Sequence, residues 1–87
     1  MATMVRVLHE LGVDLNAAAP DGGTLAHNAA SNGQEGCLRV LHELGANINA
    51  ACENGKTPAF DAAWHGHDGC LRVLNELGVD LNAAAPG

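Results

Sequence analysis

Apolar residues recur at helical spacing in three stretches of nearly the same sequence, at positions 5–12, 38–45 and 71–78. In the first stretch, Val5, Leu8 and Leu11 lie on one face of a helix and Arg6 lies on the opposite face. Each stretch ends in a glycine, which suits a left-handed cap at the C-terminal end of a helix. The pattern therefore predicts three amphipathic helices with one buried face each.

A shorter helix is predicted before the second and the third of these stretches. Thr24 is placed to cap a helix over residues 25–32, and Thr57 followed by Pro58 marks a stronger helix start in the next copy. Gly33 ends the first short helix, as its counterpart does in the second. We therefore expect units made of a turn, a short helix, a tight loop, a long helix and a linker.

These units repeat with a period of 33 residues, since 21–53 and 54–86 share 18 identities without a gap. We interpret the chain as one domain over 1–87, with a second half-repeat at 4–20 and full repeats at 21–53 and 54–87. Such a period is typical of stacked supersecondary units whose core forms between copies. The sequence thus predicts an all-α solenoid.

Ten acidic and four basic residues give the chain a formal charge of −6, which argues against nucleic acid as a partner. No run approaches the roughly 18 apolar residues of a membrane span, and no targeting signal is visible at the first residues. The three cysteines, an odd number, fit reduced core thiols better than disulfides. We therefore expect a cytoplasmic protein that binds neither nucleic acid nor membrane.

Arginine recurs at one repeat position, and a glutamate follows each arginine by four residues, in the pairs Arg6 and Glu10, Arg39 and Glu43, and Arg72 and Glu76. We interpret these pairs as the solvated face of the long helices. Within one helix, arginine before glutamate is the weaker order, so each pair would contribute at most a few tenths of a kcal/mol.

The repeats carry recognisable landmarks. The second full repeat reads G-K-T-P-A-F-D-A-A from Gly55, G-H at Gly66 and G-V-D-L-N-A from Gly78. The first reads G-G-T-L-A-H-N-A-A from Gly22 and G-A-N-I-N-A from Gly45. These residues closely resemble the G-x-T-P-L-H-x-A-A, G-H and G-A-D-V-N-A landmarks of the ankyrin repeat. The resemblance implies a non-catalytic domain that binds another protein.

The resemblance covers residues 4–87 and has departures. Leu25 stands where the family has proline, and Gln34 stands where it has the histidine of G-H. Phe60 replaces the histidine that ties neighbouring repeats together, a role that the resemblance leaves to His27. The resemblance therefore implies an incomplete set of hydrogen bonds between repeats, and the terminal repeats lack the polar caps usual in such arrays.

In ankyrin proteins, the turn tips and short helices form the concave binding face and the long helices form the convex back. By resemblance, the candidate protein-binding residues are Pro20, Asp21, Gly23, Ser31, Asn32, Glu53, Asn54, Lys56, Trp64 and His65. Trp64 is either an interface anchor or a ring lying flat across the neighbouring repeat. Asp61, beside it, is a further candidate for a binding or surface residue.

Other chemistry has weaker support in the sequence. His65, His67 and Cys70 have a spacing that could suggest metal ligands, but they lack a recurring paired spacing, so we expect no metal or cofactor. We also expect no enzyme, because no nucleophile with a base and no phosphate-binding loop is evident. Asn16 and Asn82 resemble sites of asparaginyl hydroxylation, although they could simply hydrogen-bond the linker. A mass gain of one oxygen atom after incubation with such a hydroxylase would support modification.

We therefore predict a non-catalytic protein-interaction module of about two and a half repeats. The alternative is a segment of a longer array that associates end to end through its terminal repeats. The identical sequences of 11–20 and 77–86 favour that alternative, because the two ends are built from the same parts. Head-to-tail contacts of this kind can continue into open chains.

Overall fold

The computed structural model describes residues 2–81 of the chain, and the whole of this part is helix, turn or loop, without a strand. The helices are α1 (Ala2–Glu10), α2 (Leu25–Ser31), α3 (Glu35–Glu43), α4 (Pro58–Trp64) and α5 (Asp68–Glu76). They coincide with the predicted long and short helices to within a few residues at each end. The all-α prediction is confirmed.

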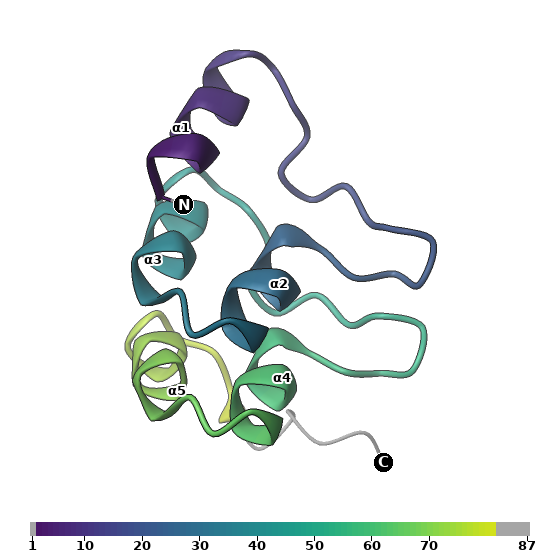
Figure 1. Ribbon diagram of the computed structural model, residues 1–87, viewed down its shortest axis with the longest axis vertical. Coiled ribbons are helices and arrows are strands. Elements are labelled where there is room, and N and C mark those ends of the chain that lie inside the picture. Colours follow the sequence, from purple (N-terminus) through teal and green to yellow (C-terminus); the bar gives the residue numbers. More distant parts are fainter. Residues whose placement is uncertain (1, 82–87) are drawn as a thin grey trace.

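The helices form two parallel rows, one of long and one of short helices. In Figure 1, α1, α3 and α5 form the row on the left, α2 and α4 form the shorter row beside it, and two loops project to the right. Contacts run along each row, between α1 and α3, between α3 and α5, and between α2 and α4. The molecule is elongated along the rows, with extents of 36 × 26 × 20 Å.

Local sequence explains where the helices begin and end. The Thr57 hydroxyl accepts a hydrogen bond from the backbone N–H of Phe60 at 3.2 Å, and Pro58 occupies the first position of α4, where a missing N–H is harmless. After α3, Gly45 adopts a φ of 83°, in the left-handed region that glycine tolerates best. The predicted glycine caps are confirmed.

The core lies between the two rows. The leucines Leu38, Leu41 and Leu74 of the long helices are fully buried. On the short helices, Ala29 and Ala62 are also fully buried, and their small side chains let α2 and α4 pack closely. Leu11, expected on the same buried face as Val5, is instead mostly exposed.

The ion pairs of the long helices differ from the prediction. Arg6 Nη2 donates to Glu43 Oε2 at 2.9 Å, and Arg39 Nη2 donates to Glu76 Oε2 at 2.7 Å. Each arginine therefore bonds the glutamate of the next repeat, 37 residues on, instead of the glutamate four residues on in its own helix. The reason is that adjacent long helices lie side by side, so the outward arginine of one faces the glutamate of the next. The pairs join repeats.

Candidate functional site

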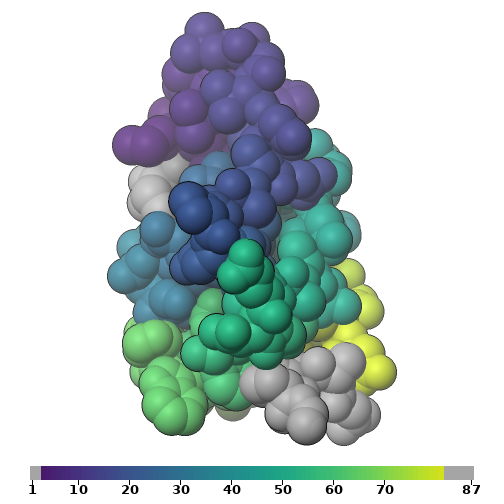
Figure 2. All heavy atoms as spheres, turned by 90° about the vertical axis from the view of Figure 1, so that its right-hand side faces the viewer, coloured from purple at the N-terminus to yellow at the C-terminus, as the bar shows by residue number. Residues whose placement is uncertain are grey.

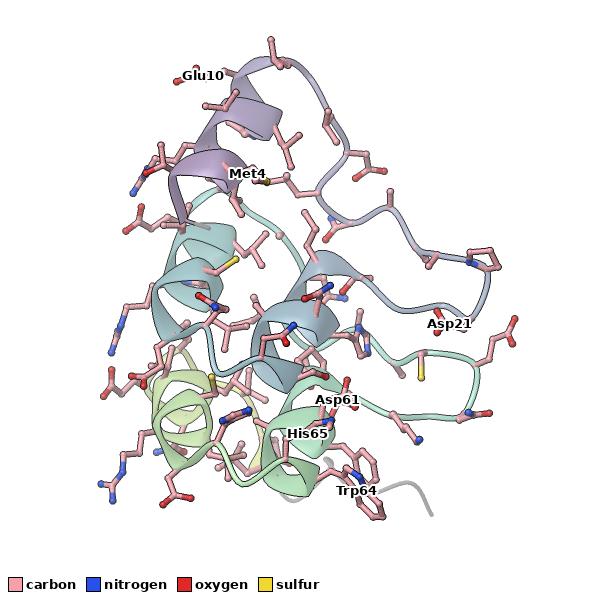
Figure 3. All side chains as sticks on the ribbon, in the orientation of Figure 1. Met4, Glu10, Asp21, Asp61, Trp64 and His65 are labelled. Carbon is pink, nitrogen blue, oxygen red and sulfur yellow. The ribbon has the colours of Figure 1, made fainter. Side chains whose placement is uncertain are left out.

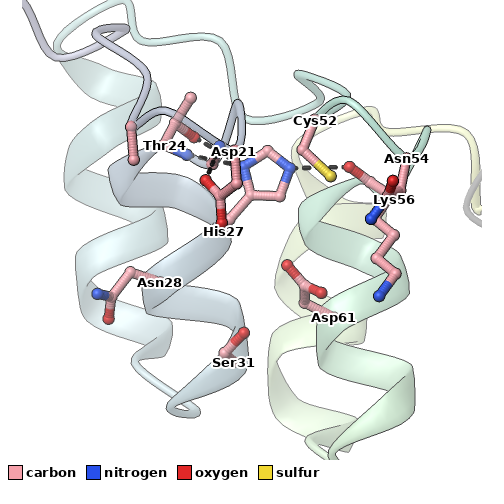
Figure 4. A pocket seen from close by; sticks show the side chains of 11 residues that line it. Asp21, Thr24, His27, Asn28, Ser31, Cys52, Asn54, Lys56 and Asp61 are labelled. Carbon is pink, nitrogen blue, oxygen red and sulfur yellow. Dashed lines mark hydrogen bonds between the residues drawn. The ribbon is translucent and has the colours of Figure 1, made fainter.

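A groove of about 400 Å³ lies beside the short helices and the turn tips that project from the repeats (Figure 4). Figure 2 faces these tips and shows one lying above the other. It is lined by Ala19, Asp21, Gly23, Thr24, His27, Asn28, Ser31, Cys52, Asn54, Lys56 and Asp61. The lining therefore comes from both turn tips and from the facing sides of α2 and α4. Turn tips and short helices are the elements that the ankyrin resemblance implied for a binding face.

The two turn tips are fixed against each other. The backbone N–H of Glu53 donates to the carbonyl oxygen of Asp21 at 3.2 Å. Gly22 follows Asp21 and has a φ of 86°, and a Cβ at this position would lie 2.9 Å from the backbone nitrogen of Glu53. The close approach therefore requires glycine at position 22, and it makes the two tips one continuous rim.

His27 fixes the floor of the groove to the second turn. Its Nδ1 accepts a hydrogen bond from the backbone N–H of Thr24 at 3.1 Å, which leaves the ring proton on Nε2. Nε2 then donates to the carbonyl oxygen of Lys56 at 2.9 Å, in the next repeat. The role implied for His27 by the ankyrin resemblance is confirmed.

Two further side chains link the repeats. His67 Nε2 is 2.9 Å from the carbonyl oxygen of Ser31, and Asn16 Oδ1 accepts from the backbone N–H of Asn47 at 2.6 Å. His67 thus has a structural partner, and the expected linker hydrogen bond of Asn16 is present. Hydroxylation at Asn16 stays a hypothesis, and Asn82 lies outside the described residues.

Charges of both signs face the groove. Asp21 Oδ1 accepts from the backbone N–H of Gly23 at 2.8 Å, which holds this carboxylate at the rim. Lys56, the single lysine of the chain, places Nζ 5.6 Å from the centroid of the Phe60 ring. Figure 4 shows Asp61 on α4 pointing into the space between the two helices. The groove can therefore both accept and donate hydrogen bonds to a ligand.

The structure brings half of the predicted site residues together in this groove, namely Asp21, Gly23, Ser31, Asn54 and Lys56. The other five do not line it, and these are Pro20, Asn32, Glu53, Trp64 and His65. Trp64 is 76% exposed and stacks on Phe60 of its own helix, with ring centroids 6.0 Å apart. It stacks within its own helix and does not lie across the neighbouring repeat, and its role as an interface anchor stays a prediction.

Among the lining residues that the prediction missed, Asn28 had a signal in the sequence. It precedes Ser31 by three residues, so the two share one face of α2. Its backbone carbonyl and side-chain oxygen accept bonds from Asn32 Nδ2, at 2.9 and 2.6 Å, so Asn32 is turned back onto its own helix. Cys52 lines the groove because of the turn conformation, which no residue pattern revealed.

The three thiols are free and differ in environment. Cys37 and Cys70 are buried in the core, and desolvation raises the pKa of both thiols above the ordinary value. The Glu35 carboxylate raises the pKa of Cys70 further. Cys52 is only half-buried, so the expectation that all cysteines lie inside the stack is wrong for this residue. In the described part of the chain, no three His, Cys, Asp or Glu side chains converge as metal ligands.

The two helical rows, the projecting turn tips and the hydrogen bonds between copies define a helical-repeat solenoid with an open groove. The sequence model of the family described as "Ankyrin repeats (3 copies)" matches residues 1–85. The chain belongs to the ankyrin repeat family.

A solved structure supports this assignment. The chain resembles the human ASB11 ankyrin repeat domain with a TM-score of 0.83 and 30% sequence identity, over 91% of this chain. The match covers 36% of the ASB11 chain, so the present chain spans about a third of that domain. A comparison with curated proteins finds no match.

Family membership carries a general function, because ankyrin repeats are protein–protein interaction modules. None of the helices within residues 2–81 is long and apolar enough to cross a membrane.

Proposed function

We propose that this domain is a non-catalytic module that holds a segment of a partner protein in the groove between its turn tips and its short helices. The observation that carries the proposal is the groove itself, whose lining gathers residues from both full repeats and Ala19 from the half-repeat before them. Because several hydrogen bonds between repeats fix those residues, the site is organised before a partner arrives, which lowers the entropy lost on binding.

The groove's chemistry favours a polar segment of the partner over an apolar one. Asp21 and Asp61 offer carboxylate oxygens, and Asn28 and Asn54 offer both donors and acceptors. Lys56 adds a single positive charge on the rim. A segment whose own side chains or backbone can satisfy these groups would bind, whereas an apolar segment would leave them without hydrogen bonds.

Trp64 supplies an apolar contact beside this polar groove. Figure 3 shows its side chain projecting from the end of α4, beyond the groove residue Asp61. Stacking on Phe60 restricts the ring in advance, so less side-chain freedom is lost when a partner covers it. Exposed tryptophan is the residue type most often found as an energetic hot spot at interfaces.

A test of the proposal begins with a photo-crosslinking amino acid placed at single positions. We would insert it at Ser31 or Trp64 on the groove side and, as controls, at His42 or Asn75, which are exposed on the long helices. Each variant is illuminated in an extract of the source organism, and the cross-linked proteins are identified by mass spectrometry. We expect one partner captured from the groove-side positions and absent from the controls.

The captured partner is then purified and titrated against the wild-type domain and two double variants. Asp61→Asn with Trp64→Ala should weaken binding by about tenfold or more, as expected for loss of an anchor and a charge. The control, His42→Ala with Asn75→Ala, should leave the dissociation constant unchanged. A partner that responds to the control pair and ignores the groove pair would refute the proposal.

A further inference from the structure

The ion pairs between long helices always join the arginine of one repeat to the glutamate of the next, and among the described residues the arginine and glutamate at the two ends of the row are not in such pairs. Arg6 bonds Glu43 and Arg39 bonds Glu76, each pair 37 residues apart. The third arginine, Arg72 on α5, has no ion pair in the part of the chain that the structure describes. Within the same part, no ion pair involves Glu10 on α1, the repeat equivalent of Glu43 and Glu76. Arg72 and Glu10, at opposite ends of the described long-helix row, are therefore both exposed, and they occupy the repeat positions that form ion pairs inside the row.

Apolar positions at the α5 end show the same unfinished pattern. Val5 and Leu38 are buried, whereas their repeat equivalent Leu71 is only half-buried. After the helices, Leu15 is 7% exposed but its equivalent Leu81 is 37% exposed. These positions are covered in a repeat that another repeat follows, so together with Arg72 they define a following face at α5.

The complementary pattern occurs at the α1 end. Val7 is 44% exposed, whereas its equivalent Val73 is 2% exposed. Val13 is likewise exposed, and its equivalent Val79 is buried. These positions are covered where another unit precedes them, so with Glu10 they define a preceding face at α1.

These two faces lie at opposite ends of the molecule. Figure 1 places α1 and α5 at the two ends of the long-helix row, with α3 between them. Figure 3 shows Glu10 at the α1 end, on the side remote from α3. The two faces therefore cannot cover each other within one chain, but they can do so between two chains.

We propose that a second copy of this chain docks its α1 against α5 of the first copy, so that Glu10 of the second copy bonds Arg72 of the first. The contact repeats the α1–α3 and α3–α5 contacts already present inside the chain. It brings the exposed apolar residues of the preceding face against those of the following face. Both the charge register and the apolar positions therefore specify the same occupant.

The arrangement has two consequences. The contact is head to tail, so each added copy leaves one free face at either end and the assembly grows without closing. The contact joins α1 to α5 and involves neither α2 nor α4, so it has no counterpart of the α2–α4 packing and should be weaker than the internal contacts. Because the groove between α2 and α4 takes no part in it, this assembly is independent of partner binding at the groove.

Sedimentation velocity over a hundredfold range of concentration tests the inference. We expect the weight-average mass of the wild-type chain to rise steadily above 8.9 kDa and to pass that of a dimer. Glu10→Arg and Arg72→Glu each place like charges in contact, and each should weaken association by about tenfold. Glu53→Arg changes the net charge as Glu10→Arg does, but at a turn tip, and should associate more strongly than Glu10→Arg.

An equimolar mixture of the Glu10→Arg and Arg72→Glu variants makes the test specific. In the mixture, the introduced glutamate of one variant meets the introduced arginine of the other, and the native pair also forms, so association should return. Circular dichroism first confirms that each variant is folded. A wild-type mass that stays at 8.9 kDa, a mass that stops at a dimer, or a mixture that associates no better than either variant alone would overturn the proposal.

Discussion

Replacing His27 by phenylalanine tests how the repeats are joined. Phenylalanine is the residue that the chain itself has at the equivalent position 60 of the next repeat. The His27 side chain is 6% exposed and bonds the backbone N–H of Thr24 and the carbonyl oxygen of Lys56. A phenyl ring can make neither bond, so the substitution removes the link between the groove floor and the second turn.

The magnitude follows from the groups left behind. A buried polar group without a partner costs about 1–3 kcal/mol, and His27→Phe leaves two such groups, both only partly buried. We therefore expect a loss of about 2–4 kcal/mol in the free energy of unfolding. Typical values per residue give the whole domain a free energy of unfolding of about 4–13 kcal/mol, so this loss is large.

Urea unfolding followed by far-ultraviolet circular dichroism measures the effect. With a typical urea dependence for a small domain, the midpoint should fall by about 1 M or more. The matched control is His42→Phe, because His42 is exposed on α3 and its replacement should change stability by at most about 0.5 kcal/mol. If His27→Phe unfolds at the same urea concentration as the wild type, the bond to Lys56 does not join the repeats as we describe.

Three further predictions concern the glycines and the thiols. Gly12→Ala should cost about 1–2 kcal/mol from its positive φ alone, whereas Gly22→Ala should cost more because its Cβ would meet the neighbouring turn; equal urea midpoints would contradict this. In the native protein, a thiol reagent should modify Cys52 quickly and Cys37 and Cys70 only on unfolding, and rapid modification of all three would contradict their burial. Burial raises the pKa of Cys37 and Cys70, so their contribution to stability is complete below about pH 8.5 and declines as the pH rises. In a variant with alanine at both positions, the free energy of unfolding should fall less steeply with alkaline pH than in the wild type. An unchanged pH dependence of stability would contradict this.

The helices were predictable from the sequence because their signals are local. The Thr57 cap, Pro58 and the glycine caps act within one turn of the residues that they affect, and all of them act in the structure as the sequence indicates. The ion pairs were not predictable in this way. Spacing along one helix suggests Glu43 as the partner of Arg39, but only the packing of α3 against α5 reveals that Glu76 lies closer.

The residues of the candidate site were likewise predictable only where their position depends on local sequence. Residues of the turn tips, such as Asp21 and Lys56, could be placed in the groove because the repeat pattern fixes where the turns project. Asn32 could not be excluded, since its hydrogen bonds to Asn28 depend on its side-chain conformation. The exposure of Leu11 was not predictable either, because periodicity identifies an apolar face without showing whether another helix covers it.

Hydrogen exchange of the domain, alone and with its captured partner, tests the central claim most directly. We expect slower exchange on binding in α2, in α4 and in the two turn tips, with no change in α3 and α5. Such a footprint would establish that this ankyrin domain binds protein through its groove. Slower exchange confined to α3 and α5 would place the partner on the convex back and would contradict the account.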